Sequence, residues 1–130
     1  MSEHKVKLAW KRDNKEFAYK TYSRNHSWEF ENGATLQASA AVDFLGDASC
    51  VDPEAAFTAS LSSCHMLTFL AIAAMRKIGV ESYTDHAVGH LGKGPNGKPI
   101  ITRVDLYPKI VFAEGQEPDR DALEKLHHLS

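Results

Sequence analysis

One long apolar segment, residues 55–75, constrains the fold of this 130-residue chain more than any other feature. Asp52-Pro53-Glu54 precedes it and is typical of a helix start, because an acceptor caps free amides, proline suits the first helical position and an acid complements the dipole. Arg76-Lys77 and then Gly79 follow it, as at a helix end. Since the segment is apolar almost all round, the sequence predicts a long buried central helix.

Before this helix, alternation of apolar and polar residues predicts four short strands, at residues 5–10, 16–21, 27–31 and 34–38. Asp13-Asn14 offers turn chemistry for joining the first two strands. Asn32-Gly33 favours a tight turn with positive backbone dihedrals between the last two. The N-terminal part is therefore expected to contain two β-hairpins, followed by a loop over residues 39–51.

After the helix, residues 83–91 and 100–112 have the composition of two long strands around a glycine-rich turn, with Pro108 interrupting the second. Pro118-Asp119 is expected to open a C-terminal helix. The order of strands, helix, strands, helix predicts an α+β fold in a single domain spanning residues 1–130. Because the sequence stops inside the last helix, the natural polypeptide is expected to continue past Ser130, through the rest of that helix and a last strand.

Charge and composition exclude several classes of function. The net charge is −2 with no dense basic cluster, so nucleic-acid binding is not expected. No secretion signal is recognisable at the start, and the most apolar run, Met66 to Met75, is shorter than the roughly 20 residues of a membrane span. Two cysteines are too few for a disulfide scaffold, which favours a reducing, cytoplasmic location and makes the role of each thiol the central question.

Cys64 lies among hydroxyl side chains and His65 in the otherwise apolar helix. Buried cysteines are common as small apolar residues, so its position alone favours packing over chemistry. A reactive role requires a nearby positive charge that stabilises the thiolate. Arg24, just before the second hairpin, is the best candidate, and Glu54 could hold it in a bidentate pair, although both residues also have ordinary roles at a surface and at a helix start.

The segment Val51 to Met66 resembles the OsmC/Ohr family of osmotically inducible and organic hydroperoxide resistance proteins, in which a Pro-Glu pair precedes a reactive cysteine by the spacing of Glu54 and Cys64. The resemblance extends to Arg24 and Trp28 and to residues 102–106, and favours the OsmC-like branch. It implies an intertwined homodimer. It also implies a thiol-dependent peroxidase that reduces organic hydroperoxides, and hydrogen peroxide as a further substrate, with no cofactor.

By this resemblance Cys64 is the peroxidatic cysteine, Arg24 stabilises its thiolate and engages the peroxide, and Glu54 orients the arginine. A thiol or dithiol, of the lipoyl type for example, would be the reductant. Ten helical residues rise about 15 Å, so Glu54 and Cys64 need a bent helix, a bridging arginine or two subunits to share a site. The family usually places its resolving cysteine in the last helix, beyond the position at which this sequence ends. Cys50 does not match that position, so the resemblance implies either a resolving cysteine in a missing tail or an external thiol.

The sequence supports a metal site or a cysteine hydrolase less well than a peroxidase. His127-His128 is not expected to bind metal, because adjacent helical side chains diverge by about 100°. The same divergence makes His65 a poor base for Cys64 and weakens a cysteine hydrolase reading, and His86 and His90 are expected to be structural. The main alternative to the peroxidase is a noncatalytic dimeric binding protein with the same fold, in which Cys64 only packs.

Overall fold

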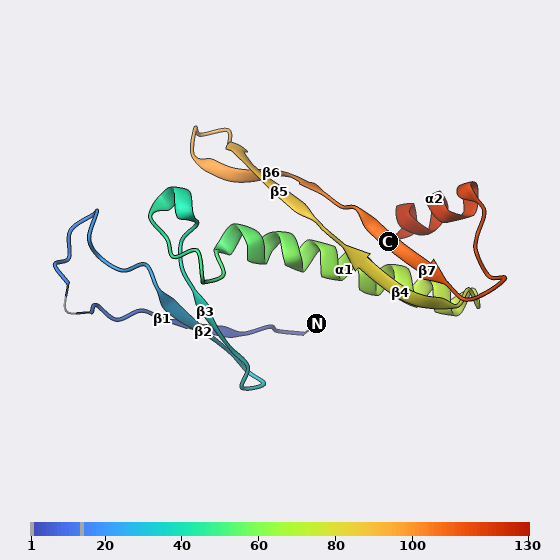
Figure 1. Ribbon diagram of the computed structural model, residues 1–130, viewed down its shortest axis with the longest axis horizontal. Coiled ribbons are helices and arrows are strands. Elements are labelled where there is room, and N and C mark those ends of the chain that lie inside the picture. The colour runs from blue at the N-terminus through green and yellow to red at the C-terminus, as the bar shows by residue number, and fades with distance from the viewer. Residues whose placement is uncertain (1, 14) are drawn as a thin grey trace. The chain divides into compact units, whose positions relative to one another are not determined.

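The expected α+β order is confirmed by the computed structural model, which describes residues 2–13 and 15–130 (Figure 1). The chain divides into two units, Met1–Ala56 and Phe57–Ser130. The elements in order are β1 (Val6–Ala9), β2 (His26–Phe30), β3 (Thr35–Ala38), a short 3-10 helix η1 (Val42–Phe44), α1 (Pro53–Met75), β4 (Val80–Asp85), β5 (Val88–Lys93), β6 (Pro99–Asp105), β7 (Pro108–Phe112) and α2 (Arg120–Leu129).

The first unit contains an antiparallel sheet with the order β1-β2-β3. The predicted second hairpin, β2–β3, is confirmed. The Phe30 amide donates to the Ala34 carbonyl at 2.8 Å, which closes a three-residue loop. Within that loop only Gly33 has a positive φ, of 89°, so the turn is longer than the two-residue type and needs its glycine at one position.

The predicted first hairpin is wrong. Residues 18–22 form a turn in which the amides of Thr21 and Tyr22 both donate to the Ala18 carbonyl, while β1 pairs directly with β2. Asn14, half of the expected connection, lies outside the described residues. The aromatic residues that produce the alternation cluster with one another instead: the rings of Phe17 and Tyr22 lie 5.2 Å apart, and Trp10 lies 5.9 Å from Phe17.

The loop over residues 39–51 leads into α1 and is tightly built. Buried Ser39 donates its amide to the Val51 carbonyl and accepts the Asp47 amide on its hydroxyl, at 2.9 and 3.1 Å. A Cβ on Gly46 would lie 1.5 Å from the Ala40 carbonyl oxygen, so only glycine fits there. The helix start is confirmed, because Oδ2 of Asp52 accepts the Ala55 amide at 3.0 Å.

The end of α1 differs from the prediction in its chemistry. Lys77, not Gly79, takes the left-handed conformation, with φ of 59°, and the Ile78 amide donates to the Ala73 carbonyl at 2.9 Å. Gly79 is required for another reason. The Gly79 amide donates to the side-chain oxygen of Gln116, and a Cβ on Gly79 would lie 2.7 Å from that oxygen.

Each of the two long strands predicted after the helix is broken into two. β4 pairs with β7 and β5 pairs with β6, both antiparallel, and Pro108 opens β7 as an interruption was expected to do. Asp85 stabilises the break, because its carboxylate accepts the Tyr107 amide at 2.7 Å and the Ser62 hydroxyl of α1 at 2.5 Å. The pairs β4–β7 and β5–β6, which we call the ribbon, are therefore held to one face of α1 by this contact.

The predicted C-terminal helix is confirmed as α2, whose N-cap Asp119 accepts the Ala122 amide at 2.8 Å. Its Leu126 is fully buried against Phe69 and Ala73 of α1. Partly buried residues of β4 and β7, among them Tyr83 and Ile110, pack around them. This small cluster is the core of the second unit.

The expectation of a buried central helix is wrong for the single chain. Only Thr58, Phe69 and Ala73 of α1 are buried, because the ribbon and α2 cover one face and leave the other uncovered. By length and composition α1 is also apolar enough to cross a membrane, a test that core helices of soluble proteins pass too. The apolar run Met66–Met75 is shorter than a membrane span, but α1 as a whole has 23 residues, so the absence of a span stays a prediction.

Candidate functional site

Cys64 lies on the uncovered face of α1. With about 100° between successive residues, it shares this face with the apolar residues Phe57, Leu61 and Leu67. Their exposed fractions are 50%, 43% and 60%, and Cys64 itself is exposed. We call Phe57, Leu61, Cys64, Leu67 and Met75 the α1 stripe. The sulfur therefore lies in an accessible apolar surface.

The opposite face of α1 makes the contacts that hold the helix. Ser62 binds Asp85, and Phe69 belongs to the core. Thr58 lies so close to β5 that a Cβ on Gly89 would be 2.1 Å from its hydroxyl oxygen. These contacts point Cys64 away from the ribbon, so its exposure follows from how the ribbon packs on the helix.

Arg24 belongs to the first unit and lies between a turn and β2. Its guanidinium donates to the carbonyls of Tyr22 and Tyr19 at 2.9 and 2.6 Å and lies 3.8 Å from the centre of the Tyr22 ring. A planar guanidinium suits both contacts, whereas a lysine could make only one of them well. Arg24 is therefore half-buried in a defined setting, which its position before a predicted strand did not reveal.

Glu54 is half-buried in the first turn of α1. The helix is continuous from Pro53 to Met75, so a bend sharp enough to interrupt it between Glu54 and Cys64 is excluded. A bridging arginine and a site shared between subunits remain. Because Arg24 and Glu54 belong to the first unit and Cys64 to the second, the assembly of the three into one site stays a prediction.

Cys50, the other thiol, is half-buried in the loop before α1. Hydrogen bonds from Ser49, and then from Asn25 and the Cys50 thiol, hold the pKa of Asp47 below its usual value. The Cys50 amide donates to the Asp47 carbonyl at 3.1 Å within that loop, whereas Cys64 lies in the apolar stripe. The two thiols differ in setting, and this makes Cys50 a useful control.

The sequence did not reveal that His65 and His127 meet. Nε2 of His65 lies 3.0 Å from Nδ1 of His127, with the rings stacked, and His127 also packs on Phe69. These residues are 62 positions apart, on α1 and α2, so no local spacing could have paired them. Only one proton can lie between the two facing nitrogens, so the contact requires at least one neutral ring.

This pair predicts a stability that depends on pH. Burial, and then the charge of His65, hold the pKa of His127 below its usual value. The unfolded chain then takes up this proton first, so the contribution of His127 is present above about pH 6.5 and is lost as pH falls through the folded-state pKa. We expect the thermal midpoint to drop less between pH 8 and pH 5 in His127→Gln than in the control His128→Gln, an exposed neighbour. Equal drops would contradict the assignment.

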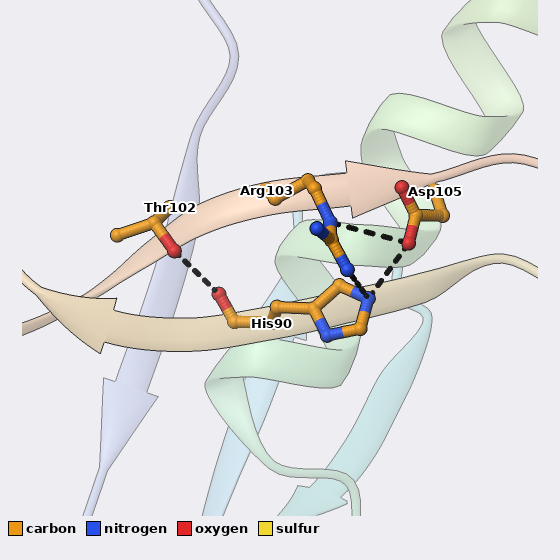
Figure 2. Close-up of polar contacts among 4 residues, drawn as sticks. All are labelled: His90, Thr102, Arg103 and Asp105. Atoms are coloured by element: carbon orange, nitrogen blue, oxygen red, sulfur yellow. Dashed lines mark hydrogen bonds and ion pairs between the residues drawn. The ribbon is translucent and has the colours of Figure 1, made fainter.

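A second polar cluster lies on the β5–β6 hairpin (Figure 2). Oδ2 of Asp105 lies 2.8 Å from Nε2 of His90 and 3.3 Å from Nε of Arg103, and the Thr102 hydroxyl donates to the His90 carbonyl at 3.4 Å. His90 is thus engaged within the hairpin, in keeping with the structural role expected for it. Within the described part of the chain, no group of three or more His, Cys, Asp or Glu could hold a metal ion.

Known structures resemble this chain closely. An OsmC-like protein of unknown function from Vibrio cholerae is 48% identical, with a TM-score of 0.91 over 99% of this chain and 87% of that one. An organic hydroperoxide resistance protein OsmC from Legionella pneumophila shares the fold at 18% identity, with a TM-score of 0.73 over 99% and 82% of the two chains. A comparison with curated proteins finds no match. Residues 46–130 match the OsmC-like protein family. With that match and the 48% identity, the chain belongs to the OsmC-like family.

Proposed function

We propose that this protein is a thiol-dependent peroxidase that reduces organic hydroperoxides through Cys64. The observation that carries the proposal is the exposure of this sulfur in the middle of the apolar α1 stripe. A thiol that only packed would be expected among buried residues, whereas a peroxide with an apolar tail needs an apolar surface beside the nucleophile. Membership of a family that includes an organic hydroperoxide resistance protein supports the same conclusion.

The chemistry is a two-electron reduction of the peroxide. The Cys64 thiolate attacks the terminal oxygen of the hydroperoxide, the O–O bond breaks, and the leaving alkoxide takes up a proton to become an alcohol. The sulfur becomes a sulfenic acid. One external thiol condenses with it, releasing water and forming a mixed disulfide, and a second thiol then restores Cys64. A dithiol of the lipoyl type would supply both reducing equivalents.

In this mechanism Arg24 stabilises the thiolate and the developing negative charge on the peroxide oxygens, and Glu54 orients the arginine. We expect Arg24→Ala to lower the rate of Cys64 oxidation by cumene hydroperoxide about a hundredfold, the usual cost of losing a donor to transition-state charge. Stopped-flow measurement of single oxidations gives this rate. Arg12→Ala, which removes an exposed arginine of the same unit, is the control, and similar rates for the two variants would exclude this role.

The α1 stripe also supports a homodimer. Exposed apolar area of this extent is costly in water, and a second copy of the chain would cover the part of the stripe that a peroxide at Cys64 does not occupy. Sedimentation equilibrium would then give twice the 14.4 kDa mass of one chain, and a single-chain mass at micromolar concentration would oppose the dimer. We further propose a cytoplasmic location, because thiols there are kept reduced and can turn the enzyme over.

Hydroperoxide consumption tests the proposed function. The protein is mixed with dithiothreitol and either cumene hydroperoxide or hydrogen peroxide, and the remaining peroxide is measured over time. We expect faster loss of the organic substrate, and expect prior treatment with iodoacetamide to stop it. Loss no faster than with dithiothreitol alone would favour the noncatalytic binding protein instead.

A further inference from the structure

Residues 22–25, which carry Arg24, have no regular secondary structure. Their position therefore depends on individual hydrogen bonds. The indole of Trp10 donates to the Ser23 carbonyl at 2.8 Å, and Nδ1 of His26 lies 2.8 Å from the Arg24 carbonyl. Both supports come from β1, β2 and their immediate neighbours in the sequence.

A further support comes from the loop before α1. The side-chain amide of Asn25, next to Arg24, donates to Oδ2 of Asp47 at 3.0 Å. The other oxygen of Asp47 accepts the amide and the hydroxyl of Ser49, at 2.9 and 2.7 Å. Asp47 thus joins the Arg24 segment to the loop that ends in the N-cap of α1.

Asp47 is itself well held. Its amide donates to the hydroxyl of Ser39, which is fully buried, and Gly46 beside it packs on the Ala40 carbonyl with no room for a side chain. The hydrogen bonds from Ser49 and Asn25 hold the pKa of Asp47 below its usual value and so favour the ionised carboxylate. This hydrogen-bonded loop therefore presents a carboxylate acceptor to Asn25.

We propose that Asp47 is a positioning residue of the peroxidase, acting through Asn25 to hold the segment that carries Arg24. The inference rests on the proposed function, in which Arg24 acts on Cys64 and the peroxide. Without the bond the segment samples other positions, and Arg24 spends less time in the productive one. In this proposal Asp47 contacts neither Cys64 nor the peroxide.

The test uses a Cys50→Ser background, so that Cys64 is the only thiol and a hydroxyl remains near Asp47. Two rates are measured at pH 7: oxidation of Cys64 by cumene hydroperoxide and its alkylation by iodoacetamide, which reports the thiolate. We expect Asp47→Ala to slow both about fivefold, the factor associated with one hydrogen bond. Asp47→Asn, which keeps an oxygen acceptor, should stay within about twofold.

Asp43→Ala is the matched control, because it removes an exposed acid from the same loop. Equal effects of Asp43→Ala and Asp47→Ala, or parent rates in Asp47→Ala, would overturn the inference. If Asp47→Ala does not fold, Asn25→Ala decides, since it removes the bond and leaves the Ser49 contacts intact. Parent rates in that variant overturn the inference.

The two proposals can fail separately. If the parent consumes no hydroperoxide, the proposed function fails, and the alkylation rates alone decide whether Asp47 controls the thiolate through Arg24. If Arg24→Ala alkylates at the parent rate, there is no effect of Arg24 to position, and the inference is overturned. A slow Asp47→Ala beside a normal Asp47→Asn supports it, because a loss of charge alone would impair both.

Discussion

Replacing Cys64 by serine is expected to reduce hydroperoxide turnover by at least about a thousandfold, because a serine hydroxyl is not ionised near pH 7 and the thiolate is the nucleophile. The change is nearly isosteric, and the side chain it alters is exposed, so the fold should be unaffected. Cumene hydroperoxide loss in the presence of dithiothreitol measures the effect. The expected loss follows from the chemistry of one atom in the α1 stripe, the Cys64 sulfur.

Cys50→Ser is the control within the same chain. Its amide donates to the Asp47 carbonyl at 3.1 Å, a backbone bond that serine keeps. We therefore expect this variant to keep turnover within about twofold of the parent. If Cys64→Ser turns over at the parent rate, or if only Cys50→Ser is impaired, the reacting sulfur has been assigned to the wrong residue.

Replacing Phe69 by alanine is expected to have the largest effect on stability. Phe69 is fully buried, its ring packs edge-on against Tyr83 at 5.6 Å, and it contacts the His127 ring at 4.6 Å. Truncating such a ring removes the contacts that join α1, β4 and α2 and leaves a cavity, at a cost of about 3–5 kcal/mol in the free energy of unfolding. Unfolding in guanidinium chloride, followed by circular dichroism, gives this value.

Tyr107→Ala removes a ring of similar size from a side chain that is 59% exposed, and its backbone bond to Asp85 is unaffected. We expect this control to cost less than about 1 kcal/mol. A Phe69→Ala cost no larger than that of Tyr107→Ala would mean that the second unit is not held together by its small core cluster.

Local signals in the sequence predicted the starts of the two helices and one hairpin. Asp52 and Asp119 cap the two helices as expected, because an N-cap depends only on residues within one turn. The β2–β3 hairpin followed from Asn32-Gly33 for the same reason. The α+β class followed from the order of these elements.

Sequence patterns did not predict features that depend on contacts between residues far apart in the chain. The alternation at Phe17 and Tyr19 has the period of a strand, yet these residues lie at a turn. There the Phe17 ring packs on Trp10 and the Tyr19 ring lies against the Arg24 guanidinium. The apolar composition of α1 predicted burial on all sides, but only three of its residues are buried. Composition does not show which faces of a helix other elements of the same chain cover. The His65–His127 pair was missed because it joins helices far apart in the sequence.

For the candidate site, the sequence and its family resemblance identified Cys64, Arg24 and Glu54 but not their surroundings. The structure adds that Cys64 is exposed on an apolar stripe and that Arg24 is held by carbonyls and Tyr22. It also adds the hydrogen bonds of Asp47, which no spacing pattern predicts, since Asn25 and Asp47 are 22 residues apart. The arrangement of the three predicted residues in one site remains a prediction.

The most direct measurement of the central claim follows oxidation of both thiols in the same molecule. The protein is treated with one equivalent of cumene hydroperoxide in the presence of dimedone, which traps sulfenic acids, and peptides containing Cys50 and Cys64 are quantified by mass spectrometry. A peroxidatic Cys64 predicts rapid, near-complete trapping there and little at Cys50. Equal and slow trapping at both cysteines, or none, would contradict the account.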